Sequence, residues 1–160
     1  SEQPSTSSMP STSTMPTSMP STSSMPTCPL EEYSQTSEVD TMNAIGEILK
    51  FPFVDLPLSL ADVDVTVFLK GDISGRKDWY YLEGKYTTVG YPARFFPHEE
   101  CGVFVQEDFV MSATRFNKVV VDGKLDLQMR PFRNDIDPGT CSEEDGNQAY
   151  IKLSYMYRYC

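Results

Sequence analysis

The sequence has one histidine and one tryptophan among 160 residues, and it lacks several patterns that mark enzymes and membrane proteins. The HExxH, GxSxG and P-loop patterns are all absent, which removes three common hydrolase and nucleotide-binding motifs. No stretch approaches about 18 consecutive apolar residues, so a membrane-spanning helix is not expected. No Asn-x-Ser/Thr sequon occurs, so any glycan would be O-linked. We therefore expect a protein that is not an enzyme and has no cofactor.

Two short stretches carry residues that could do chemistry, and each has a simpler explanation. His98 and Cys101 in "PHEEC" could form a nucleophile and its base, but a disulfide at Cys101 would consume the thiol. The acidic run 134–147 could offer carboxylates to calcium, but it lacks the glycine and glutamate positions of a twelve-residue hand loop. A solvated loop or a contact surface for a basic partner is the favoured interpretation, and no metal site is expected.

Residues 4–27 consist only of serine, threonine, proline and methionine, and they carry no charge. The recurring prolines prevent a continuous helix or a central strand. This composition is typical of O-glycosylated, mucin-like stalks, and an unmodified flexible linker is the alternative. We expect residues 1–30 to be a disordered tail and residues 31–160 to form a single disulfide-bonded domain.

Four cysteines in a short chain indicate two disulfides formed in an oxidising compartment. They are Cys28, Cys101, Cys141 and Cys160. Their spacing contains no CxxC pair, which disfavours zinc and thioredoxin-type sites, and the sequence leaves all three pairings open. Because Ser1 also resembles the start of a mature chain after removal of a signal peptide, the cysteines predict a secreted protein.

The formal net charge is -10. A negative field of this kind repels nucleic acid and anionic membranes, and it speeds encounter with basic partners. The alternative is a surface charge that only keeps a secreted protein in solution. Charge therefore excludes two classes of partner without naming one.

The spacing of apolar residues changes along the chain, from the period of a helix to the period of a strand. Residues 37–50 predict a short helix, and residues 51–60, with two prolines, predict an extended run without regular pairing. The expected apolar face of the helix is Met42, Ile45, Ile48 and Leu49. Later segments alternate with a period of two or are rich in aromatic and β-branched residues, and they predict strands. These segments are 62–70, 79–89, 102–111, 118–129 with a tight turn at Asp122-Gly123, and 149–160.

One short helix followed by at least six strands predicts an all-β domain. The strand edges must be protected by closure into a barrel or by packing of two sheets in a sandwich. The long, sequential strand order favours the barrel: an antiparallel β-barrel preceded by the short N-terminal helix. Tyrosines along 149–160 suggest an interior with some polar lining.

Three aromatic residues in a row, Trp79, Tyr80 and Tyr81, have two interpretations. They could form a stacking platform for sugars. A strand whose rings alternate into the core is the more frequent explanation.

Two segments resemble those of tick salivary lipocalins. They are "WYYLEGKYTTVGYPARFFPHEECGVFV", similar to an aromatic strand followed by a turn and a cysteine, and "YIKLSYMYRYC", similar to a tyrosine-rich last strand ending in cysteine. The chain stops at Cys160, where typical members continue to a C-terminal helix, and it has the Ser/Thr/Pro-rich tail. With these two departures, its four cysteines and its acidity, the chain resembles the Isac-type salivary anti-complement proteins of hard ticks.

That resemblance implies a lipocalin-like barrel and a secreted salivary protein that inhibits the host complement alternative pathway. Members bind properdin, which is built of basic, aromatic thrombospondin-type repeats, and displace it from the convertase. The residues that we expect to contact such a partner are chosen for their charge. They are Glu99, Glu100, Asp135, Asp137, Glu143, Glu144 and Asp145. Two alternatives stay open: a lipocalin-type carrier of a small hydrophobic ligand or amine, and a carbohydrate-binding module.

Overall fold

We describe a computed structural model of residues 28–71, 79–94, 102–133 and 147–159. The chain divides into two compact units, residues 1–29 with residue 160 and residues 30–159. The account below concerns the second unit. In the first, Cys28 is disulfide-bonded, and its partner lies outside the described residues. No helix in the described part of the chain has the length and apolar character needed to cross a membrane.

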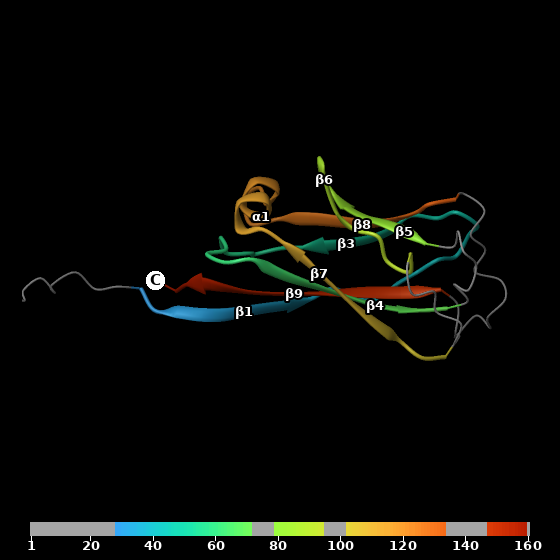
Figure 1. The fold of residues 1–160 in the computed structure, drawn as a ribbon, viewed down its shortest axis with the longest axis horizontal. Helices are drawn as coiled ribbons and strands as arrows, with labels where there is room; N and C mark the ends of the chain where they lie inside the picture. The colour runs from blue at the N-terminus through green and yellow to red at the C-terminus, as the bar shows by residue number, and fades with distance from the viewer. Residues whose placement is uncertain (1–27, 72–78, 95–101, 134–146, 160) are drawn as a thin grey trace, which may run out of the picture. The chain divides into compact units, whose positions relative to one another are not determined.

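The second unit is built from two antiparallel sheets (Figure 1). The first sheet has the order β1-β9-β4-β7, with the short β2 paired to β9. Its strands are β1 (Leu30–Thr36), β2 (Asp40–Thr41), β4 (Val63–Lys70), β7 (Val105–Met111) and β9 (Gln148–Arg158). The second sheet has the order β3-β8-β5-β6. Its strands are β3 (Leu49–Phe53), β5 (Tyr80–Gly84), β6 (Thr87–Gly90) and β8 (Leu125–Pro131).

The prediction of a closed barrel is wrong, because the two sheets form a sandwich. A barrel needs backbone pairing between the edge strands of the two sheets, and the sheet order contains no such pair among the described strands. Side chains hold the two seams instead. At the first seam, Gln35 of β1 donates from Nε2 to the carbonyl of Val54 at 2.9 Å, and its Oε1 accepts from the Val54 amide at 3.3 Å. The side chain of Gln35 thus bonds both the amide and the carbonyl of Val54, the backbone groups with which a neighbouring strand would pair.

At the second seam, β6 and β7 meet through an aromatic ring and a carboxylate. The ring of Phe109 lies directly over Gly90, where a Cβ would overlap it. Two residues along β7, the Glu107 carboxylate accepts a hydrogen bond from the backbone amide of Ala93 at 2.7 Å. Both side chains come from the partly buried positions of an edge strand, so the seam is closed without a backbone ladder.

The predicted N-terminal helix at 37–50 is also wrong, and side-chain competition for backbone groups explains the difference. The Asp40 carboxylate accepts from the amides of Thr41 and Lys50, and the Glu47 carboxylate accepts from those of Asn43 and Ala44. These bonds fix a turn, with Gly46 at a φ of 74°, between β2 and β3. Of the four residues expected on an apolar face, Met42 and Leu49 are buried, whereas Ile45 and Ile48 are exposed.

The helix that the structure does contain, α1 (Ala113–Val119), lies between β7 and β8. Ser112 caps it by accepting a hydrogen bond at Oγ from the Arg115 amide at 3.2 Å. Phe116 is its one buried residue. A single buried position gives no helical period, which is why the apolar pattern did not indicate a helix here.

Most of the strand predictions are confirmed, with three changes. Segment 79–89 is two strands, β5 and β6, joined by a turn at Lys85 and Tyr86. In 118–129 the turn at Asp122-Gly123 is present with both φ angles positive, but α1 precedes it where a strand was expected. Residues 51–60 were expected to be extended without regular pairing, but the first of them belong to β3. Residues 49–53 pair regularly with β8, and Pro52 is accommodated because β3 is an edge strand.

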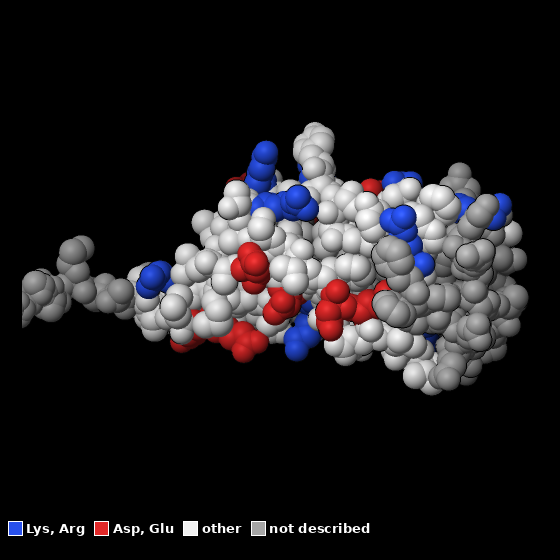
Figure 2. Space-filling view, viewed as in Figure 1, with Lys and Arg blue, Asp and Glu red and all other residues white. Residues whose placement is uncertain are grey.

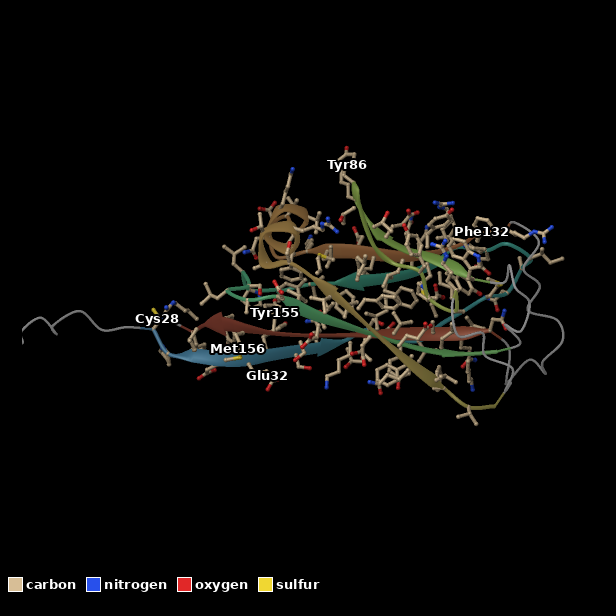
Figure 3. The ribbon with its side chains drawn as sticks, viewed as in Figure 1. Cys28, Glu32, Tyr86, Phe132, Tyr155 and Met156 are labelled. Atoms are coloured by element: carbon tan, nitrogen blue, oxygen red, sulfur yellow. The ribbon has the colours of Figure 1, made fainter. Side chains whose placement is uncertain are left out.

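The core between the sheets is filled with apolar side chains. Every second residue of β4 is fully buried, and β3 and β8 show the same alternation. Figure 3 shows Tyr155 between the two sheets, and it is 3% exposed. The carrier alternative required a barrel interior, and the described sheets instead pack on each other through these side chains.

Tyr155 makes folding sensitive to alkaline pH. Burial, followed by the nearby Tyr33 and Tyr157, raises the pKa of its hydroxyl well above the usual value. The hydroxyl donates to the carbonyl of Pro57 at 2.7 Å. In the unfolded chain a tyrosine loses its proton near about pH 10, whereas the folded domain retains it. Unfolding above that pH therefore releases a proton, and the free energy of unfolding falls as pH rises.

We expect this alkaline loss to be reduced in Tyr155→Phe. At neutral pH the variant should be less stable by about 1 kcal/mol, because one hydrogen bond is lost. Urea unfolding at about pH 7 and about pH 11 measures both effects. Equal alkaline losses in the variant and the wild type would contradict the assignment to Tyr155.

Candidate functional site

A group of four aromatic and two arginine side chains lies on the outer face of the second sheet. It consists of Trp79, Tyr81, Tyr91, Arg94, Arg130 and Phe132, which we call the aromatic–arginine surface. Strand alternation creates it. Tyr80 points between the sheets, so its neighbours Trp79 and Tyr81 lie on the opposite face, where Trp79 is itself buried. On β8, Met129 is buried, so Arg130 points outward.

Pairing of β5 with β8 brings these side chains together in two rows. Tyr81 is opposite Arg130 in the register. Two positions further, beyond the pair Tyr80 and Pro131, the amide of Phe132 donates to the carbonyl of Trp79 at 2.8 Å. Tyr91 and Arg94 come from the segment that follows β6. Figure 3 labels Phe132 just past the end of β8 and beside β5.

Trp79 is the centre of the ring contacts. Its ring stacks on Phe132 with 4.1 Å between centroids and 13° between planes. Tyr91 meets Trp79 edge-on at 5.6 Å and 87°, and Tyr81 lies at 5.0 Å and 57°. Offset-stacked and edge-to-face pairs of this kind stabilise each other beyond the area they bury. The four rings are therefore fixed relative to one another.

Both guanidinium groups lie on ring faces. Arg94 is 5.0 Å from the centroids of both Trp79 and Tyr91, and Arg130 is 4.3 Å from that of Tyr81. Arg130 also forms an ion pair with Glu83, with 2.8 Å between Nε and Oε1. The hydrogen bond from Arg130 lowers the pKa of the Glu83 carboxyl. These contacts hold each guanidinium group over an aromatic ring.

The surface has a covered centre and exposed flanks. Trp79 is 8% exposed, whereas Tyr91 is 36% and Phe132 39% exposed. Rings that are ordered yet accessible lose little conformational entropy when they bind. Tryptophan, tyrosine and arginine are also the residues that contribute most to binding energy at protein interfaces. The arrangement suits binding through surface contact.

The structure describes some of the predicted site residues, and the others lie outside the described ranges. All seven acidic contact residues lie outside the described residues, as do His98, Cys101, Cys141 and Cys160. Of the aromatic triplet, Trp79 and Tyr80 are both buried, Trp79 on the same side of the sheet as the partly buried Tyr81 and under the ring of Phe132. Within the described ranges no group of three His, Cys, Asp or Glu residues could hold a metal ion.

Sequence reasoning missed Tyr91, Arg94, Arg130 and Phe132. The alternation of β8 did indicate that Arg130 points away from the core, because Leu125, Leu127 and Met129 share the opposite face. What it could not indicate is the strand pairing that places Arg130 opposite Tyr81. The segment after β6 gave no periodic signal.

No family model and no curated protein matches the chain. Among solved structures, it is similar to the C-terminal carbohydrate-binding module (CBM6) of LamC, a marine laminarinase from Zobellia galactanivorans. The identity is 11%, the TM-score is 0.39, and the match covers 78% of this chain and 98% of that one. A PBCV-1 virus capsid structure is similar at 8% identity and a TM-score of 0.37, over 86% of this chain and 45% of that one. Because both TM-scores are below 0.5, these likenesses carry no argument about function.

Proposed function

We propose that this chain is a secreted, non-enzymatic binding protein that holds a protein partner on its aromatic–arginine surface. The observation that carries the proposal is the pair of exposed rings, Tyr91 and Phe132, fixed against the covered ring of Trp79. Arg94 lies over the ring of Tyr91, and Arg130 lies over that of Tyr81. A rigid aromatic centre with polar groups around it is the usual composition of an energetically dominant contact.

The partner that we propose is properdin, and the resulting function is inhibition of the host complement alternative pathway. The support is the resemblance to Isac-type proteins together with two physical features. The net charge of -10 draws a basic partner to the chain at long range. At close range, the accessible faces of Tyr91 and Phe132 can receive the partner's guanidinium groups as cation–π contacts. Properdin held in this way would be displaced from the convertase.

Carbohydrate binding is the second candidate, and the same exposed rings favour it. Sugar rings stack on accessible aromatic faces, and the guanidinium groups of Arg94 and Arg130 are donors for hydroxyl groups. Trp79 is covered by Phe132 and Arg94, so stacking would fall to Tyr91 and Phe132. A polysaccharide would therefore contact two rings and not the tryptophan.

The test is biolayer interferometry of the full chain on immobilised properdin, with inhibition of alternative-pathway haemolysis as a second readout. We expect Tyr91→Ala combined with Phe132→Ala to weaken binding by about 100-fold or more, since each removes an exposed ring from the contact. The matched control is Tyr86→Ala, which removes an exposed ring at a distant turn, and it should bind properdin like the wild type.

Each result has a separate meaning. Wild-type binding that the double variant retains would overturn the aromatic–arginine surface as the contact. Absence of wild-type binding to properdin would overturn that partner. A glycan array would then decide whether the same two rings bind a saccharide.

A further inference from the structure

A groove of about 660 Å³ lies between the β5–β6 turn and α1, away from the aromatic–arginine surface. Its two walls come from segments far apart in the sequence, Lys85 to Thr88 on one side and Ser112 to Val121 on the other. Figure 3 shows Tyr86 projecting from the tip of the turn, and this ring is 94% exposed. The volume is in the range that holds a drug-sized ligand.

Three cationic side chains line this groove: Lys85, Arg115 and Lys118. Not one residue of the lining is acidic. Within the described part of the chain, none of the three cations forms an ion pair. Arg115 is held across the groove by a hydrogen bond from Nη1 to the carbonyl of Thr88 at 3.3 Å, which leaves its other donors for a ligand.

This concentration of positive charge contrasts with the molecule as a whole, whose net charge is -10. In Figure 2, blue side chains lie over α1 and at other places along the second sheet, while red ones lie mainly lower on the same face. The nearest acidic neighbour in sequence, Asp122, follows Val121 of the lining but does not itself line the groove. Lys85 Nζ lies 5.2 Å from the centroid of Tyr86, but no carboxylate of the described residues pairs with the three cations. Cations that line one groove without a carboxylate partner repel each other and are stabilised by a bound anion.

The rest of the lining restricts the kind of anion. Hydroxyl groups come from both walls, including Thr87 on one side and Ser112 and Thr114 on the other. Val119 and Val121 add an apolar patch next to them. A sulfated sugar has matching parts: sulfates for the cations, hydroxyls for the threonines and serine, and C–H faces for the valines and Tyr86.

We infer that this groove binds a short sulfated oligosaccharide, with Lys85, Arg115 and Lys118 holding its sulfate groups. The site is separate from the one in the proposed function, so either can be wrong without the other. Nucleic acid fits less well, because Tyr86 is the one ring in the lining and successive bases need several stacking rings. An anionic membrane fits less well too, because the net charge of -10 repels an extended negative surface.

The experiment is isothermal titration calorimetry of the full chain with a heparin-derived hexasaccharide at low salt. We expect binding that weakens as salt rises, since exposed charges are screened. The chemically desulfated hexasaccharide should bind at least about tenfold more weakly. Lys85→Ala combined with Lys118→Ala should lower the affinity for the sulfated sugar by about tenfold or more.

The matched control is Lys50→Ala combined with Lys152→Ala, which removes the same two charges from exposed positions outside this groove. It should change the affinity by less than about twofold. Thermal unfolding establishes that both double variants fold. Equal losses in the two double variants would overturn the groove as the site. Equal binding of the desulfated sugar, or tighter binding to single-stranded DNA or phosphatidylserine vesicles, would overturn the assignment to a sulfated saccharide.

Discussion

Replacing Phe116 with alanine should lower the free energy of unfolding by about 3–5 kcal/mol, the usual loss when a fully buried phenylalanine is truncated. Phe116 is 0% exposed, and its ring lies 4.8 Å from that of Tyr155. It is also the one buried residue of α1, so the variant removes the helix's main attachment to the core. Urea unfolding monitored by tryptophan fluorescence measures the loss.

Phe132→Ala is the matched control, because the same side chain is removed from a position that is 39% exposed. Its cost should be well under half that of Phe116→Ala, since less surface returns to water and no closed cavity forms. A loss below about 1 kcal/mol for Phe116→Ala would mean that α1 contributes little to the fold. In that case α1 would also be a less rigid wall of the groove lined by Lys85, Arg115 and Lys118.

Replacing Gly90 with alanine should destabilise the domain by about 1–3 kcal/mol, because the new methyl group would overlap the ring of Phe109. Backbone strain does not enter, since Gly90 is not among the residues with positive φ. The cost is therefore that of moving the ring that closes the seam between β6 and β7. Chemical denaturation of the single variant gives its size.

Gly84→Ala provides the comparison at the other end of the same hairpin. A Cβ there would meet Leu127 at 3.4 Å, which is ordinary contact, so the change should be nearly neutral. Combining Gly90→Ala with Phe109→Ala should cost less than the sum of the two single variants by about 1 kcal/mol or more, because the overlap is gone. Strict additivity would show that Phe109 does not lie over Gly90 in solution.

The sequence predicted strands where alternation was long and the inner face apolar. Val63, Val65, Val67 and Leu69 are all buried as expected, and so are Leu125, Leu127 and Met129. The Asp122-Gly123 turn followed from residue types that tolerate positive φ. These features depend on neighbours in sequence, which is why they could be derived without a structure.

The choice between barrel and sandwich depended on contacts that alternation does not encode. Gln35 and Phe109 close the two seams through side chains from edge strands, and neither residue type signals that role. The helix expected at 37–50 failed for a related reason, because Asp40 and Glu47 bind backbone amides that a helix would have used.

The candidate site was predicted only in part. Charge density directed attention to acidic residues, all outside the described ranges, whereas Trp79 and Tyr81 were noted for their rings. Four of the six members of the aromatic–arginine surface come from β8, the residue that follows it and the segment after β6. Which strands become neighbours in a sheet is decided by the whole fold, so a composite surface of this kind cannot be read from one segment.

The pairing of the first and last strands has a mechanical consequence. Leu30 at the start of β1 is opposite Arg158 at the end of β9, so both ends of the domain lie at the same end of one antiparallel ladder. A pulling force applied between these two residues would load the hydrogen bonds of that ladder one after another and not all together. The domain should therefore unzip at low force when stretched through its ends, even though the same ladder resists chemical denaturation as part of a cooperative core.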